Sequence, residues 1–119
     1  MDDQAAMPAR DACVVGPLLE RWARERPERP FLEFEDGSAW TFREMRVRTR
    51  RAAAGLHALG LRRGDRLLSW MPNRRETVLG WFGANWLGAA YVPVNTAWRG
   101  ALLQHAITLS QAEVMIVDA

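Results

Sequence analysis

Apolar residues recur at helical spacing in four segments of the chain, and a nearly continuous apolar run follows each of the last three. The predicted helices are Pro17–Arg26, residues 41–60, residues 73–87 and a segment that Asn95 or Thr96 opens. The predicted strands are residues 66–71, 90–94 and 113–119, whose length and composition are typical of strands buried on both faces. This alternation over short loops predicts right-handed parallel crossovers in a doubly wound or related α/β sheet.

A β-hairpin is predicted ahead of the long second helix. Apolar residues lie on both sides of the sequence EDGS, and its Asp36-Gly37 pair is among the strongest short signals for a tight turn. Thr41 stands three residues before Glu44, the spacing of a capping box, so the helix is expected to begin there. The predicted fold class is therefore α/β, an N-terminal β-hairpin followed by helix–strand units of a mostly parallel sheet.

Helical spacing also predicts which side chains point inward. They are Phe42, Met45, Thr49, Ala52, Ala53, Leu56 and Leu59 in the second helix, Val78, Leu79, Trp81, Phe82, Trp86 and Leu87 in the third, and Leu102, Leu103, Ala106, Ile107 and Leu109 in the fourth. The glycines at 80, 83 and 88 lie inside or at the end of a helix. They indicate close helix packing, because a nucleotide-binding glycine loop has to follow a strand.

The amino-acid composition excludes several kinds of catalytic and metal-binding chemistry. All 16 basic residues are arginine, which excludes a Schiff base and a phosphate-loop lysine within these 119 residues. Cys13 has no partner for an internal disulfide, and His57 and His105 alone cannot complete a zinc site. We therefore assign no metal site and no catalytic residue. A single cysteine favours a reducing, cytoplasmic location.

Two classes of partner are set aside on sequence grounds. Residues 77–98 carry no charge over the length of a spanning helix, but their asparagines, proline and glycines argue against a transmembrane segment. Arg43, Arg46 and Arg50 share one helix face, which predicts a solvated surface more than a nucleic-acid site. Residues 1–10 have no apolar periodicity, so a disordered N-terminus is expected over residues 1–13, ahead of one domain at residues 14–119.

The segment Asn95–Arg99 is the candidate binding loop. It follows the strand 90–94, and ligands of open α/β sheets bind beyond the carboxyl ends of parallel strands. The competing interpretation is that Asn95 and Thr96 cap the next helix, that Arg99 is solvated, and that Trp98 covers the end of the strand.

Four motifs occur in a specific order along the chain. They are T-[FY]-x-E at residues 41–44, L-G-x-x-x-G-D at 59–65, x-P-N-x-x-E at 71–76 and G-A-x-x-V-P-x-N at 88–95. From about Val14 onward the chain resembles the beginning of the large N-terminal domain of the adenylate-forming enzymes. These are acyl-CoA synthetases, peptide-synthetase adenylation domains and firefly-type luciferases. The sequence VPVNTAWRG is most similar to the carnitine and crotonobetaine CoA ligase branch.

The resemblance implies an ATP-dependent acid–CoA ligase. In such enzymes a carboxylate attacks the α-phosphate of ATP with Mg²⁺ present, and the thiol of coenzyme A then displaces AMP. The phosphate loop and the catalytic lysines of the family lie further along than residue 119, so the chain is expected to be an inactive fragment that binds none of these cofactors tightly alone.

The resemblance also implies that Asn95, Thr96, Ala97, Trp98 and Arg99 border the coenzyme A channel, with Arg99 meeting a phosphate of coenzyme A. The alternative is a non-catalytic module that pairs with a partner chain, or with itself, through an exposed sheet edge.

Overall fold

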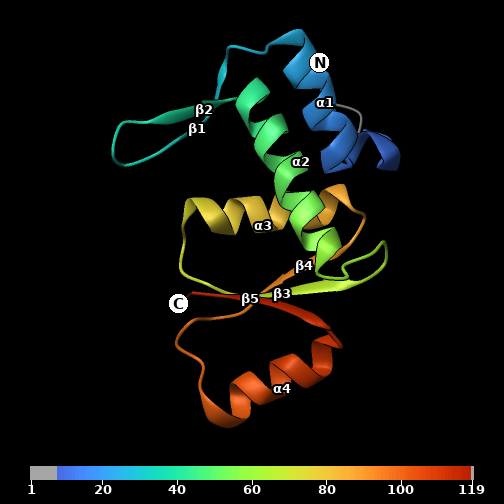
Figure 1. Cartoon of the computed structure of the whole chain (residues 1–119), viewed down its shortest axis with the longest axis vertical. Helices are drawn as coiled ribbons and strands as arrows, with labels where there is room; N and C mark the ends of the chain where they lie inside the picture. The colour runs from blue at the N-terminus through green and yellow to red at the C-terminus, as the bar shows by residue number, and fades with distance from the viewer. Residues whose placement is uncertain (1–7, 119) are drawn as a thin grey trace, which may run out of the picture.

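The computed structural model describes residues 8–118, which form two β-sheets and four α-helices (Figure 1). The N-terminal part of the predicted disordered segment, residues 1–7, lies outside the described residues. The structure differs from that prediction at Arg10–Cys13, which form a one-turn 3₁₀ helix, η1, where the amide of Ala12 donates to the carbonyl of Ala9 at 2.9 Å. No residue of η1 is buried, so this turn rests on local hydrogen bonding alone.

Helices α1 and α2 and a hairpin make up the N-terminal half. Helix α1 is Val15–Glu25, strands β1 (Pro30–Glu33) and β2 (Ala39–Thr41) pair antiparallel, and helix α2 is Phe42–Ala58. The predicted capping box is present, since the Thr41 amide donates to Glu44 Oε2 at 2.8 Å and the Glu44 amide donates to Thr41 Oγ1 at 3.2 Å. The predicted hairpin and the start of the long helix are confirmed.

The C-terminal half is a parallel sheet with helices on both faces. Strands β3 (Arg66–Trp70), β4 (Ala90–Pro93) and β5 (Val114–Val117) lie in the order β4-β3-β5. Helix α3 (Arg75–Trp86) joins β3 to β4, and helix α4 (Gly100–Ser110) joins β4 to β5 across β3. These two crossovers run in opposite directions across the sheet, so right-handed connections put α3 and α4 on opposite faces, as Figure 1 shows. The predicted α/β class is confirmed.

Helices α2 and α3 end in the same hydrogen-bonded motif. After α2, Gly60 (φ 104°) donates to the carbonyl of His57, and Leu61 donates to that of Leu56 at 3.0 Å. After α3, Gly88 (φ 79°) and Ala89 repeat both bonds. In this Schellman motif the residue after the glycine is turned back onto the helix. Leu61, only 1% exposed, thus takes the core position predicted for Leu59, which is 67% exposed.

The contact between α2 and α3 is made by small side chains. A Cβ on Gly83 would lie 3.1 Å from the Cβ of Ala52, and one on Gly80 would lie 2.6 Å from Ile116 Cδ1. Both glycines are buried, which confirms their predicted role in close packing. Trp81, predicted to point inward, is 46% exposed because the helix is turned to present its glycines to α2 and the sheet.

Two helices begin later than predicted. Helix α3 starts at Arg75 with Arg74 and not Asn73 at its N-cap, and the Arg74 amide donates to Thr77 Oγ1 at 3.3 Å. Helix α4 starts at Gly100, because residues 95–99 form a separate loop. No residue of α4 is buried.

The predicted inward leucines and isoleucine of α4 are wrong in three cases. Leu102, Ile107 and Leu109 are 59%, 39% and 72% exposed, whereas Leu103 and Ala106 are half-buried toward the sheet. Within residues 8–118 no helix is long and apolar enough to cross a membrane.

Candidate functional site

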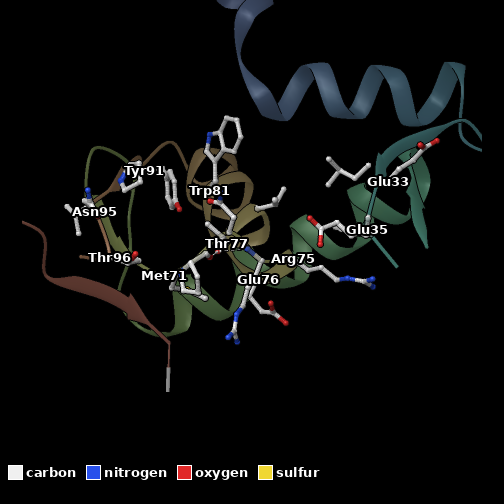
Figure 2. A pocket seen from close by; sticks show the side chains of 18 of the residues that line it. Glu33, Glu35, Met71, Arg75, Glu76, Thr77, Trp81, Tyr91, Asn95 and Thr96 are labelled. Atoms are coloured by element: carbon white, nitrogen blue, oxygen red, sulfur yellow. Dashed lines mark hydrogen bonds between the residues drawn. The ribbon is translucent and has the colours of Figure 1, made fainter. Parts of the chain in front are cut away.

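A solvent-open cleft of about 1170 Å³ lies at the carboxyl ends of β3 and β4. Three parts of the chain line it: the hairpin, the segment from Met71 to Val78 that enters α3, and the segment after β4. Figure 2 shows Glu33 and Glu35 of the hairpin at one end of the cleft and Asn95 and Thr96 at the other, with Arg75 and Thr77 of α3 between them. Residues 60 positions apart in the chain therefore face one space.

The predicted loop contributes two residues to this cleft. Asn95 and Thr96 line it, and Ala97, Trp98 and Arg99 do not. The loop is ordered by the side chain of Asn95, whose Oδ1 accepts from the Ala97 amide at 2.9 Å, and by its carbonyl, which accepts from the Trp98 amide at 3.0 Å. The prediction that Asn95 or Thr96 caps the next helix is wrong, because the N-cap of α4 is Arg99 and Asn95 forms an Asx turn within the loop.

Arg99 turns back onto its own loop. Its Nη1 donates to the carbonyls of Thr96 and Trp98, the latter at 2.8 Å, and its guanidinium carbon lies 4.7 Å from the centre of the Trp70 ring. Trp70 ends β3, so this stacking fixes the loop against the strand beside β4.

An aromatic wall that the sequence reasoning missed borders the cleft. The rings of Trp81 and Tyr91 stack with centroids 6.3 Å apart, and both residues line the space. The Tyr91 hydroxyl is buried and has no hydrogen-bond partner among the described residues. The sequence did contain a signal for this wall, because a tyrosine in an otherwise apolar strand carries a hydroxyl that needs a hydrogen-bond partner.

Arg75 connects the two walls of the cleft. Its Nη2 lies 2.6 Å from Asp36 Oδ2 and also donates to Ser38 Oγ, and its guanidinium carbon is 4.0 Å from the centre of the Phe34 ring. Hydrogen bonds from the Ser38 side chain and backbone to Asp36, together with the Arg75 charge, hold the pKa of the Asp36 carboxyl below its ordinary value. The neighbouring Arg74 pairs with Asp118 after β5 at 3.0 Å. The N-terminus of α3 is thus tied both to the hairpin and to the sheet.

Three of the five arginines of α2 contact nearby groups. Arg43 pairs with Glu28 at 2.6 Å, Arg46 pairs with Glu20 at 2.6 Å, and Arg48 lies over the Trp40 ring at 4.4 Å. These contacts fasten α2 to the segments around it.

The cleft is lined by charged and neutral polar groups, among them the carboxylates of Glu33 and Glu35 and the amide of Asn95. Asn95 Nδ2 can donate a hydrogen bond to a ligand, Thr96 Oγ1 can donate or accept one, and Trp81 adds an apolar surface to the lining. Nothing in residues 8–118 gathers three His, Cys, Asp or Glu side chains at a position to hold a metal ion. Asn95, Thr96 and Trp81 thus offer hydrogen-bonding groups and an apolar surface to a ligand in the cleft.

A parallel sheet with helices on both faces places the protein among the open α/β folds, whose ligands bind beyond the carboxyl ends of the strands, where this cleft lies. The family model described as AMP-binding enzyme matches residues 19–119. The chain belongs to the AMP-binding enzyme family.

Similar proteins agree with this assignment. The chain is 36% identical over 104 residues to a mitochondrial medium-chain acyl-CoA ligase, ACSF2, of Danio rerio, covering 87% of this chain and 17% of that protein. It is 40% identical over 74 residues to 4-coumarate–CoA ligase 2 of Oryza sativa subsp. japonica, covering 61% of this chain and 13% of that one. The solved complex of VinN with L-aspartate superposes with a TM-score of 0.81 at 27% identity, covering 89% of this chain and 27% of that chain. The chain therefore spans less than a fifth of the length of these two ligases.

Proposed function

We propose that this chain forms the first part of an ATP-dependent acid–CoA ligase and contributes scaffold and one wall of the coenzyme A channel. The observation that carries the proposal is the position of Asn95 and Thr96, which line the cleft at the carboxyl end of β4 in a member of the AMP-binding enzyme family. Two relatives named as acyl-CoA and 4-coumarate–CoA ligases support the reaction class.

In this proposal ATP and Mg²⁺ are handled by residues other than these 119. The chain has no lysine and the described residues have no metal-ligand cluster, so it carries no group for the adenylate-forming step. Asn95 and Thr96 bind and orient the thiol arm, and Ala97, Trp98 and Arg99 complete the loop that borders the channel. The chain alone is then inactive.

The branch of the family is proposed from the loop sequence. Residues 92–100 favour the carnitine and crotonobetaine branch, whereas the relatives above are named for medium-chain acids and 4-coumarate. A cytoplasmic location is proposed from the single exposed cysteine, Cys13. The zebrafish relative is described as mitochondrial, so fractionation of cells expressing the natural gene is the appropriate check.

Coenzyme A binding tests the proposal directly. In a titration of ¹⁵N-labelled chain with coenzyme A, we expect chemical-shift changes centred on Asn95 and Thr96. Thr96→Val removes a hydroxyl from the cleft and should weaken binding about fivefold, the equivalent of one hydrogen bond. Thr108→Val is the matched control, because Thr108 is an exposed threonine of α4 away from the cleft. Shifts elsewhere, or equal effects of both variants, would remove the channel from the proposal.

Inactivity is tested separately. The chain is mixed with ATP, Mg²⁺, coenzyme A and each of carnitine, a medium-chain fatty acid and 4-coumarate, and AMP is measured. We expect no release above the rate without protein. Release of AMP with any acid would overturn the statement that the chain is inactive alone and would name its substrate class.

A second candidate function is favoured by the sheet edges. Strands β4 and β5 pair only with β3 among the described residues, Val117 of β5 is 53% exposed, and Leu109 of α4 is 72% exposed. A non-catalytic module that pairs with another chain, or self-associates, would cover these groups. Sedimentation at rising concentration should then show a growing mass that Leu109→Glu reduces and Val47→Glu, on α2, does not. A constant monomer mass argues against self-association.

A further inference from the structure

Arg99 is placed so that its charge serves its own loop. It occupies the N-cap position of α4, where the helix macrodipole disfavours a cation. Contacts within the loop offset this unfavourable interaction with the helix dipole, because Arg99 Nη1 donates to the carbonyls of both Thr96 and Trp98. The guanidinium also lies over the ring of Trp70 at 4.7 Å, a distance typical of a cation–π contact.

The hydrogen bonds within the loop converge on its two ends. Asn95 accepts from the amides of Ala97 and Trp98, and Arg99 donates to the carbonyls of Thr96 and Trp98. The middle of the loop has no other hydrogen bond within residues 95–99 among those the structure describes. The conformation that presents Asn95 and Thr96 to the cleft therefore depends on Asn95 from one side and on Arg99 from the other.

We propose that Arg99 is a positioning residue that holds the loop Asn95–Trp98 against Trp70, and that it does not bind a phosphate of coenzyme A. Arg99 does not line the cleft, whereas Asn95 and Thr96 do. The part of the inference that concerns coenzyme A rests on the proposed function, and the part that concerns loop order stands on the contacts alone.

Lysine and alanine variants separate the two roles. A planar guanidinium can bridge two carbonyls while it stacks on an indole, and a lysine ammonium cannot do both. A phosphate contact, by contrast, needs mainly the positive charge, which Arg99→Lys keeps. Positioning therefore predicts that Arg99→Lys behaves like Arg99→Ala, and phosphate binding predicts that it behaves like the unaltered chain.

Amide exchange with solvent, measured by NMR in the free protein, tests the loop order. In Arg99→Ala and Arg99→Lys we expect exchange at Ala97 and Trp98 to rise about tenfold, with Leu67 and Leu68 of β3 unchanged as the check that the sheet is folded. Arg51→Ala, which removes an exposed arginine of α2, should leave the loop unchanged. Trp70→Leu removes the ring beneath the guanidinium and should raise exchange at the same two amides. Unchanged exchange at Ala97 and Trp98 in both Arg99 variants would overturn the inference.

A pair of ligands tests the role toward coenzyme A. Pantetheine has the thiol arm of coenzyme A without its phosphates. If Arg99 positions the loop, Arg99→Ala lowers the affinity for both ligands by the same factor. A loss for coenzyme A alone would establish a phosphate contact and overturn the inference. If the unaltered chain binds neither ligand, the proposed channel fails, and the exchange measurement by itself decides the role of Arg99.

Discussion

The helices on the two faces of the parallel sheet are covered to very different degrees. On one face α3 packs on β3 and β4, α2 packs on α3, and α1 covers both, so that Leu67 of β3 is fully buried. On the other face α4 lies alone and carries no buried residue. Both α3 and α4 are apolar in sequence, so apolar character by itself does not bury a helix. Burial required other helices to pack against it, and only α3 has them.

The cleft lies on the boundary between these two faces. Its walls come from the closed side, through the hairpin, Trp81 and Tyr91, and its far end comes from the loop that leads into α4. One wall of the cleft is therefore rigid, and the loop at its far end is held by a few side-chain contacts. Substitutions in such a loop can change the contacts with a ligand without disturbing the core.

The largest difference between the faces should appear in a matched pair of leucines. Leu67→Ala, at a residue with 0% exposure, should lower the free energy of unfolding by about 2–5 kcal/mol, because the deletion leaves a cavity. Leu109→Ala, at 72% exposure, should change it by less than about 0.5 kcal/mol. Urea unfolding followed by tryptophan fluorescence measures both. Equal losses would mean that α4 is covered as well as α3.

A pair of glycine variants tests the small-residue contact of the closed face. In Gly83→Ala the new Cβ would meet Ala52 Cβ and the Ala53 amide nitrogen at 3.1 Å, and backbone cannot move aside cheaply. The cost of overpacking outweighs the better helix propensity of alanine, so the free energy of unfolding should fall by about 1 kcal/mol. Gly55→Ala in α2, where nothing lies within 4 Å, should instead gain about 0.5 kcal/mol by thermal melting. A gain in both variants would contradict the close packing of α2 on α3.

Helix α4 ends at a residue with a strained backbone, and removing that strain should stabilise the protein. Helix α4 closes at Gln111 with φ 55°, whereas α2 and α3 are followed by glycines at positive φ. Gln111→Gly should raise the free energy of unfolding by about 0.5 kcal/mol, because glycine adopts this conformation without a Cβ clash. Gln111→Ala keeps the Cβ and is the control, for which no gain is expected. Chemical denaturation decides between them.

The smallest effect concerns the ion pair that joins α1 to α2 on the closed face. The hydrogen bond from Arg46 holds the pKa of Glu20 below its ordinary value of 4.5. A lowered folded-state pKa contributes stability that is fully present above the unfolded-state value and is lost as the pH falls through the folded-state value. Helix α4 contains no acidic residue, so the open face has no counterpart.

Glu20→Gln should therefore be less stable than the unaltered chain at pH 7 and equal to it well below pH 4. Both groups of the pair are partly exposed, so salt should reduce the difference. Unfolding curves at the two pH values, with and without added salt, make the comparison. A difference that grows on acidification would contradict the direction of the Glu20 shift.

Local signals were read correctly from the sequence. The capping box at Thr41, the Asp36-Gly37 turn and the glycine that ends α2 each depend on hydrogen bonds between residues at most five apart. The order of helices and strands followed from hydrophobic period in the same way. Within the site, the position of Asn95 and Thr96 beyond a parallel strand was predictable, since that is where such sheets leave space for ligands.

The remaining features depend on parts of the chain that are distant in sequence. The close approach of α2 and α3 decided that Gly83, and not Trp81, faces α2. Leu61 takes the core position expected for Leu59, because the Schellman turn folds the chain back onto α2. The hairpin wall of the cleft and its tie through Arg75 join segments 39 residues apart. The sequence by itself determined the elements, their order and the capping box that begins α2, because these follow from short-range bonding. Only the tertiary structure decided which apolar faces are covered and which side chains share the cleft, because both depend on long-range packing.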